Sequence, residues 1–381
     1  MTFSSPFRAL AVALLAGAPV LASAVSLAEG KLFLNGNGQW SYQATSRAGT
    51  AYLEADSGGD WQTAMFDLLA VAKPTEELTL NAQMGFEATG EVSLEWAFME
   101  WKLSDALRIR AGKVKQPFGN YAELQFVGTG RPLYDLPTSI YGPAGIVADA
   151  YQGIGLTGDL PFGSGWNFQY DLWGGALKTA TFEPFDWFNG ETPTAAAPSI
   201  EEISVEYILG ARASVTAPNG WTYRFSGYGG NADAGEGEKN VTYAAVAASA
   251  WYRGEKLWLS AEASYGPDKG YEKSAAGYLE AAWFLTEKVQ VAGRYEILRA
   301  DIEGLKGSDA LGRHDGYTVG ASYWISPGAV LRASVDYVKG TRFLRREAWD
   351  EAAETGTLIG IPTARTVGET FRFLVGTQFT F

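Results

Sequence analysis

The chain of 381 residues has no cysteine, a single histidine and few charged residues, which make up 19% of the sequence. Without cysteine it can form neither disulfides nor thiolate metal sites, and it has no cysteine nucleophile. Acidic residues outnumber basic residues by 43 to 30, which gives a net charge of -13. A nucleic-acid-binding protein presents a basic surface, so this balance argues against nucleic acid as a partner.

Long hydrophobic runs are also missing, because the only uninterrupted apolar stretch lies near the N-terminus, at residues 9–21. This stretch is too short to cross a membrane as a helix. If the rest of the chain spans a membrane, it must do so as a closed β-barrel, because lipid offers no hydrogen-bond partner to unpaired backbone groups.

The N-terminus has the layout of a secretory signal peptide. Arg8 supplies a basic region, an apolar stretch follows, and Ala22, Ser23 and Ala24 fit a cleavage site of the A-x-A type. A second site ends at Ala28, and the sequence leaves both open. We therefore predict a signal peptide within residues 1–28, cleaved after Ala24 or Ala28, and a barrel domain over residues 29–381.

Apolar and polar residues alternate along most of the remaining chain. In residues 77–88, for example, Leu78, Leu80 and Ala82 alternate with Thr79 and Asn81. Such a period of two is typical of a β-strand with one apolar and one polar face. The pattern predicts sixteen strands, at residues 31–43, 63–71, 77–88, 92–102, 107–113, 152–160, 166–175, 203–215, 221–229, 241–252, 257–265, 276–285, 289–299, 317–325, 330–338 and 370–381.

Alternation alone does not distinguish a soluble β-sandwich from a membrane barrel, but strand length, number and connections do. Most predicted strands have about ten residues, the span of a tilted transmembrane strand, and their number is even. Short Pro, Gly and Asn turns, as at residues 73–75 and 218–220, take turns with longer polar connections. We predict an all-β fold, a transmembrane antiparallel β-barrel of about 16 strands.

Two further features point to the outer membrane of Gram-negative bacteria. Aromatic residues recur near predicted strand ends, where they would form interfacial girdles: Trp40, Trp96, Trp101, Trp166, Trp221, Trp251, Trp283, Trp324 and Tyr337. The last strand ends in Phe381 and resembles the C-terminal signature of Gram-negative outer-membrane barrels. That resemblance implies the barrel-assembly machinery as a partner, with outer-membrane lipid and lipopolysaccharide around the barrel.

The connection at residues 115–151 would be the third external loop and is the longest in the first half of the chain. About sixteen strands close into a cylinder roughly 30 Å wide, which wall side chains alone cannot fill. We therefore expect this loop to fold inward and narrow the pore. The predicted constriction consists of Arg108, Arg110, Lys113, Lys115, Glu123, Arg131, Asp135, Asp149, Arg332 and Arg372.

The stretch Arg108-Ile-Arg-Ala-Gly-Lys113-Val-Lys115-Gln-Pro-Phe-Gly119, with Gly130-Arg-Pro-Leu-Tyr134, resembles the same region of Gram-negative porins related to the phosphate-selective porin family. The close likeness covers about a fifth of the chain. It implies a homotrimer of barrels with loop-narrowed pores. The family's dense lysine and arginine tracks are not evident in this acidic sequence, which leaves phosphate selectivity open.

Basic residues on the polar faces or at strand ends admit two roles. They could create a field across the constriction together with an acidic loop, or they could form structural ion pairs with Glu95, Glu262, Glu280 or Glu296. The sequence leaves both roles open for Lys102, Arg108, Arg110, Arg224, Arg294, Arg332 and Arg372.

The sequence therefore predicts a porin for passive diffusion of small hydrophilic solutes and ions. A substrate-specific channel for an anion such as phosphate, or for a sugar, is the alternative. A barrel enzyme is less favoured, because His314 lies in a predicted external turn and no G-x-S-x-G nucleophile motif accompanies it. No cofactor or metal is expected.

Overall fold

The computed structural model describes residues 25–381 except 54, 62–63, 88–89, 143–144, 183–199, 233–240, 270–271, 303–311, 341 and 346–367. The predicted signal peptide lies, up to Ala24, outside the described residues. The barrel consists of β2 (Leu32–Thr45), β4 (Met65–Ala72), β5 (Leu78–Glu87), β6 (Val92–Ser104), β7 (Leu107–Lys115), β8 (Ala150–Phe162), β9 (Trp166–Phe182), β10 (Ile200–Thr216), β11 (Trp221–Ala232), β12 (Val241–Arg253), β13 (Leu257–Lys269), β14 (Glu272–Phe284), β15 (Val289–Ile302), β16 (Arg313–Ser326), β17 (Ala329–Gly340) and β19 (Glu369–Thr380).

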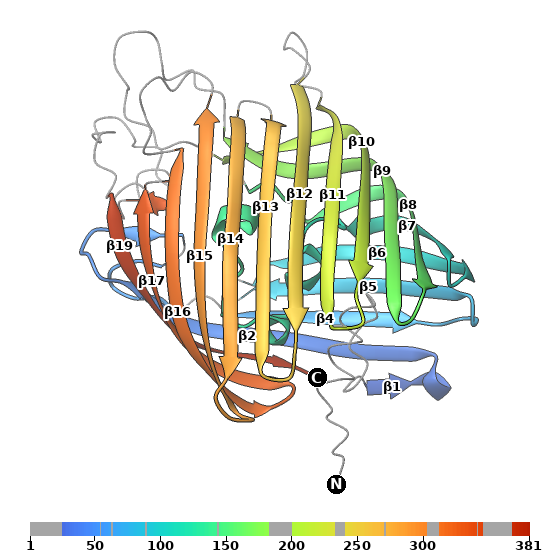
Figure 1. Ribbon diagram of the computed structural model, residues 1–381, viewed down its shortest axis with the longest axis horizontal. Helices are drawn as coiled ribbons and strands as arrows, with labels where there is room; N and C mark the ends of the chain where they lie inside the picture. Colours follow the sequence, from blue (N-terminus) through green and yellow to red (C-terminus); the bar gives the residue numbers. More distant parts are fainter. Residues whose placement is uncertain are drawn as a thin grey trace.

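These sixteen strands form one closed antiparallel ring (Figure 1). Each strand pairs with the next one along the chain, and the last strand, β19, pairs with the first, β2, from Arg372 opposite Thr45 to Thr380 opposite Asn37. A short strand, β1 (Val25–Leu27), extends the pairing at the start of β2. The predicted all-β antiparallel barrel is confirmed, and every predicted strand overlaps one observed strand.

The two faces of the wall differ in polarity. Along β14, buried Glu272, Ser274 and Glu280 alternate with exposed residues such as Leu279 and Trp283. Since successive side chains of a strand point to opposite faces, the polar residues face the interior and the apolar residues face outward. An exposed apolar outer belt around a polar interior is the arrangement that a lipid bilayer requires.

The connections are sorted between the two ends of the barrel. At one end they have two to five residues, and the C-terminus lies at the same end (Figure 1). At the other end most are longer, but the expectation that all of them are long is wrong, because only residues 88–91 and 270–271 separate the strands there. Strands β13 and β14 extend beyond the predicted segments and take up residues that the sequence pattern assigned to a loop.

The aromatic girdles are smaller than predicted, since several of the aromatic residues face the interior. Trp251 and Trp324 are only 3% and 2% exposed, and the Nε1 of Trp96 donates to the interior side chain of Gln83. The exposed side chains of the predicted set include Trp40, Trp101, Trp166 and Trp283. A strand end brings a residue near an interface, but its parity along the strand decides which face it occupies.

His314 also lies elsewhere than predicted. Because β16 begins at Arg313, His314 is a strand residue, only 1% exposed, and not a solvated turn residue. Its ring stacks near Tyr52 and meets the edge of Phe343. Tyr52 belongs to a two-stranded sheet of β3 (Ala51–Tyr52) and β18 (Leu344–Arg345), and Phe343 directly precedes β18. This sheet joins the first and last long connections.

Helical segments within the described residues are short. They are η2 (Ala28–Gly30), η3 (Ala122–Leu124), η4 (Gly128–Gly130) and α2 (Thr138–Tyr141), the last three in the connection between β7 and β8. None of the described helices has the length and apolar character needed to cross a membrane.

Close packing at the seam between β2 and β19 yields a prediction. Gly38 lies beneath the ring of Phe379, and a Cβ there would come within 2.2 Å of the ring carbon Cζ. The substitution Gly38→Val should displace the ring and destabilise closure by about 1–3 kcal/mol. The temperature at which the folded band converts to the unfolded band in detergent electrophoresis should fall. Ala44→Val, on the same face of β2, is the control, and an equal effect of both variants would contradict the role of this seam.

Candidate functional site: the loop inside the barrel and the inner wall

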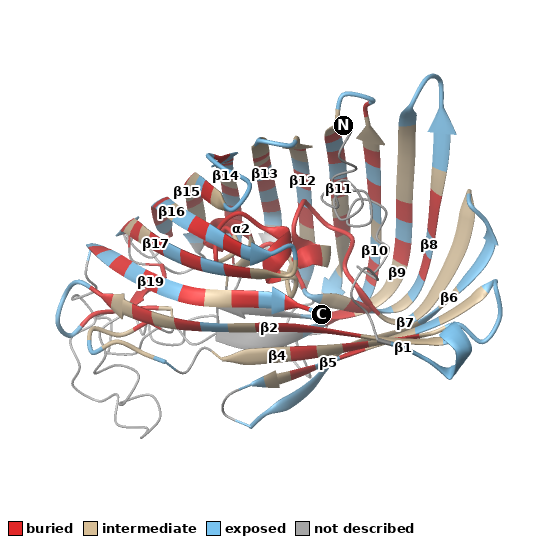
Figure 2. Ribbon diagram, turned by 90° about the horizontal axis from the view of Figure 1, so that it is seen from below, coloured by how far each residue is buried: buried red, intermediate tan, exposed pale blue. Residues whose placement is uncertain are grey.

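The connection between β7 and β8, residues 116–149, contacts the polar inner faces of many strands. Figure 2 shows α2, part of this connection, within the ring of strands. Its side-chain hydrogen bonds reach from Gln39 on β2 to residues on β10 through β17 and on β19. A segment with partners on so many strands is held as a unit against one side of the interior. We call it the inner loop.

Three glutamates on neighbouring strands accept hydrogen bonds from the inner loop. Glu262 on β13 accepts from the backbone N–H of Asn120 at 3.1 Å and from the hydroxyl of Tyr141 at 2.8 Å. Glu280 on β14 accepts from Tyr121, and Glu296 on β15 accepts from the backbone N–H of Ser139 at 2.9 Å. These carboxylates satisfy backbone and hydroxyl donors that would otherwise be buried without partners.

Arginines of the wall supply the complementary donors to carbonyl oxygens of the inner loop. Arg332 donates to Gly128 at 2.8 Å and also to Arg131, Arg294 donates to Asp135 at 2.9 Å, and Arg253 donates to Gly130 at 3.0 Å. Arg224 donates to Asn120 and stacks on Trp251, with 4.3 Å between the guanidinium carbon and the ring centroid. Among the described residues, no carboxylate lies within 4.0 Å of Arg224, Arg253 or Arg332. Their main role is therefore to hold the loop backbone.

Two ion pairs join the inner loop to opposite sides of the wall. Asp135 pairs with Arg372 of β19, which also pairs with Asp336 of β17 at 2.6 Å. Glu123 pairs with Arg212 of β10. Burial raises the pKa of the Glu123 carboxyl, but the Arg212 guanidinium outweighs burial and lowers the pKa of Glu123 to about 2. Glu123 therefore stays ionised and paired at neutral and mildly acidic pH.

The inner wall from β5 to β9 is less covered. The side chains of Arg108 and Arg110 on β7 are 16% and 15% exposed, whereas those of Glu280 and Arg294 beneath the inner loop are 2% exposed. Arg108 pairs with Asp159 on β8, and Arg110 pairs with Glu100 on β6 at 2.7 Å. Other partly exposed residues on this inner face include Thr79, Asn81, Trp96, Phe98, Asn167 and Gln169.

The two predicted lysines separate. Lys115 is buried between aromatic rings, with Nζ 4.9 Å from the ring centroid of Trp96 and 4.6 Å from that of Phe126. Lys113 pairs across the sheet with Ala97 and Gln152 on the outer face, and its Nζ donates to the carbonyl of Leu94 at 2.6 Å. The register of β7 is unbroken from Arg108 to Lys113, so strand parity places Lys113 on the face opposite Arg108 and Arg110. Lys113 therefore does not join the other predicted residues inside the barrel.

The other nine residues of the predicted constriction contact the inner loop or line the interior, but in three groups. Arg108 and Arg110 lie on the less covered wall; Lys115, Glu123 and Asp149 lie near the junction of the inner loop with β7; Arg131, Asp135, Arg332 and Arg372 lie on the covered side. Of the two roles left open for the basic residues, these contacts favour structural ion pairs over a field across the constriction, since Arg108, Arg110, Arg294 and Arg372 all form ion pairs. Lys102 pairs with Asp105 at an exposed turn.

Sequence reasoning missed Arg212, Arg253 and Asn120 as functional residues. Strand parity could have placed Arg212 inside, because it shares a face with Ser214 on β10. Asn120 lies in the inner loop and bonds to groups more than 100 residues away, including Ser260 and Tyr278. No local signal in the sequence indicates such partners.

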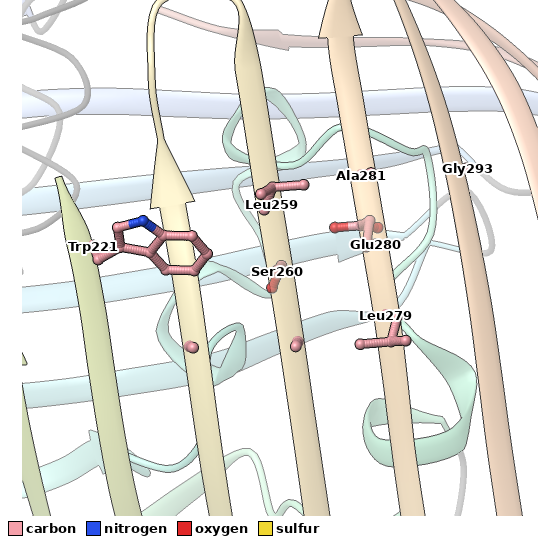
Figure 3. A pocket seen from close by; sticks show the side chains of 9 residues that line it. Trp221, Leu259, Ser260, Leu279, Glu280, Ala281 and Gly293 are labelled. Atoms are coloured by element: carbon pink, nitrogen blue, oxygen red, sulfur yellow. The ribbon is translucent and has the colours of Figure 1, made fainter. Parts of the chain in front are cut away.

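A pocket on the wall belongs to the outer face. It is lined by residues of β11 to β15, including Trp221, Leu259, Leu279, Ala281 and Gly293, which point outward by strand parity (Figure 3). Leu279 is 63% exposed, in contrast to the interior residue Glu280 next to it. The apolar lining of this pocket faces the bilayer side, so the pocket is not a solute site.

No protein-family model and no curated protein sequence matches the chain. Solved structures do match it over nearly its full length. The outer membrane channel DcaP of Acinetobacter baumannii has a TM-score of 0.60 at 10% identity, covering 94% of this chain and 100% of that one. The anion-selective porin from Comamonas acidovorans has a TM-score of 0.57 at 14% identity, covering 92% and 99%.

OmpT, an outer membrane protein of Vibrio cholerae, matches with a TM-score of 0.56 at 11% identity, covering 94% of this chain and 100% of that one. It has also been solved in a trimer form. The chain has the fold of the outer-membrane porins. At these identities the likeness extends to the porin fold alone, and the finer resemblance to the phosphate-selective porin family stays a prediction.

The attachment of the inner loop yields a second prediction. Glu262→Ala removes the acceptor of the Tyr141 hydroxyl and one of the two acceptors of the Asn120 N–H, and a buried donor left without a partner costs about 1–3 kcal/mol. The start of the inner loop should detach from β13, which should increase the exchange of its amide hydrogens and the noise of any channel current. Ser264→Ala, at the next interior position of β13, is the matched control. Unchanged exchange in Glu262→Ala would contradict the anchoring role of this carboxylate.

Proposed function

We propose that the protein is an outer-membrane porin, which forms a water-filled channel for passive diffusion of small hydrophilic solutes and ions. The main support is the asymmetry of the interior. The inner loop covers β10 to β19 and leaves polar, partly exposed side chains along β5 to β9. A barrel that only served as a structural element would gain nothing from keeping charged groups such as Arg108 and Asp159 accessible. The porin fold of the matching structures supports the proposal.

A channel specific for a sugar is the second candidate, because the less covered wall carries an aromatic platform. The rings of Trp96 and Phe98 stack with centroids 5.5 Å apart, and Arg110 and Glu100 lie beside them. Flat rings next to charged hydrogen-bonding groups suit the apolar face and hydroxyls of a sugar ring. An anion-specific channel has less support, since Arg108 and Arg110 are already neutralised by carboxylates.

We also propose that the protein is exported to the Gram-negative outer membrane by the N-terminal signal peptide and inserted there by the barrel-assembly machinery. Lipid and lipopolysaccharide would then contact the apolar outer belt. The trimer form of the similar OmpT, together with the resemblance of the region around β7, supports a homotrimer.

Conductance in a planar bilayer tests the proposed function. The purified protein should form channels of large conductance with three equal conductance levels, because each inserted trimer would carry three parallel pores. Phosphate and maltodextrins separate the candidates, since a general porin should show no saturable block and a specific channel should be blocked by its solute. A folded protein that never conducts would contradict the porin proposal.

The mature N-terminus can also be predicted. Val25 pairs with Leu34, and Leu27 pairs with Leu32, so cleavage after Ala28 would remove β1. We therefore favour cleavage after Ala24. The intact mass of the protein purified from outer membranes should correspond to a chain that begins at Val25, and a mass that corresponds to Glu29 would exclude this choice.

A further inference from the structure

We propose that the channel favours cations over anions, and that Glu95 and Asp149, near the junction of the inner loop with β7, are the main determinants. This inference rests on the proposed porin function and deepens it. It concerns the less covered side of the barrel, where solutes have room to pass. The net negative charge of the whole chain is not an argument for cation preference, because most charged residues lie outside this part of the barrel.

On this side, the partly exposed Arg108 and Arg110 and the buried Arg212 all form ion pairs. Arg108 and Arg110 form ion pairs with Asp159 and Glu100, and Arg212 pairs with both Glu123 and Asp171. Each of these guanidiniums therefore presents little net charge to a passing solute. These three guanidiniums pair with four carboxylates, namely Asp159, Glu100, Glu123 and Asp171, so the paired groups leave no excess of positive charge on this side.

Of the four carboxylates around Lys115, three have no cation within 4.0 Å among the described residues, namely Asp67, Glu95 and Asp149. Asp149 is exposed and accepts from the amide of Gln125 at 2.8 Å. Glu95 is partly exposed and accepts from the hydroxyl of Ser93. Neither of these uncharged donors neutralises the carboxylate.

Asp67 adds a second kind of observation. It is 3% exposed, and its Oδ1 has no hydrogen-bond partner. Gly85 separates it from Glu95, because a Cβ at that glycine would lie close to Oε1 of Glu95 and 3.5 Å from Oδ1 of Asp67. A buried carboxylate oxygen without a donor is costly. A cation that passes nearby would lower this cost by attraction at longer range, whereas an anion would raise it.

One cation, Lys115, lies among these carboxylates. Its ammonium interacts with Asp67, Glu123, Glu95 and Asp149. The rings of Trp96 and Phe126 enclose it, and its side chain is almost fully buried. Since Glu123 is paired with Arg212, three carboxylates face a single enclosed ammonium. The local potential is therefore negative, and in a narrow, low-dielectric passage such a potential concentrates cations.

The reversal potential under a potassium chloride gradient tests this inference. The wild-type channel should have a permeability ratio of potassium to chloride above one. Glu95→Gln and Asp149→Asn should each bring the ratio toward one, and the double variant should bring it further. Lys115→Met should raise it. Glu287→Gln removes one carboxylate from an exposed turn at the other end of the barrel and should leave the ratio unchanged.

The outcomes separate this inference from the proposed function. If the protein conducts but the wild type favours chloride or shows no preference, cation preference is wrong while the porin proposal stands. If the wild type favours potassium but Glu95→Gln and Asp149→Asn change the ratio no more than Glu287→Gln, the assignment to these residues is wrong. If neither wild type nor variants conduct, the proposed function itself fails. Heat modifiability of each variant in detergent electrophoresis confirms that the barrels compared are folded.

Discussion

The structure depends on the requirement that every backbone N–H and C=O within the bilayer has a partner, which only a closed ring of strands meets for a β-protein. Pairing of β19 with β2 closes this ring. Closure forces one face of every strand outward and the other inward, so apolar residues such as Leu279 and polar residues such as Glu280 can be neighbours in sequence. The wide interior that results creates the need for a second structure within it.

The inner loop meets that need through reciprocal hydrogen bonding. The wall offers carboxylates to the amides and hydroxyls of the loop, and guanidiniums to its carbonyls, as at Glu262 and Arg332. Burying so many polar groups is tolerated only because these carboxylates and guanidiniums find hydrogen-bond partners in the loop. The result is asymmetry, since the inner loop covers the attached side of the barrel, whereas the side from β5 to β9 keeps partly exposed polar and charged side chains such as Arg108 and Asp159. Function thus follows from the position of the loop rather than from the barrel alone.

Much of the barrel could be predicted from sequence because its signal is local. The period of two over residues 77–88 or 370–381 reports strand and face together, and all sixteen strands follow from it. The prediction failed at single residues. Strand parity places Lys113 on the face opposite Arg108 and Arg110, which the predicted constriction overlooked, and the early start of β16 buries His314. The partners of the inner loop escaped prediction because Asn120 and Tyr278, for example, are brought together only by closure of the ring.

On the proposed function, solutes pass along β5 to β9 and not along the side covered by the inner loop. Because the chain has no cysteine, single cysteines can be introduced at interior positions and treated with a charged, water-soluble thiol reagent while the current is recorded. Asn81→Cys, on partly exposed β5, should react and lower the conductance, whereas Ser274→Cys, only 1% exposed on β14, should remain unmodified. Rapid modification and block at Ser274→Cys with no effect at Asn81→Cys would contradict the account.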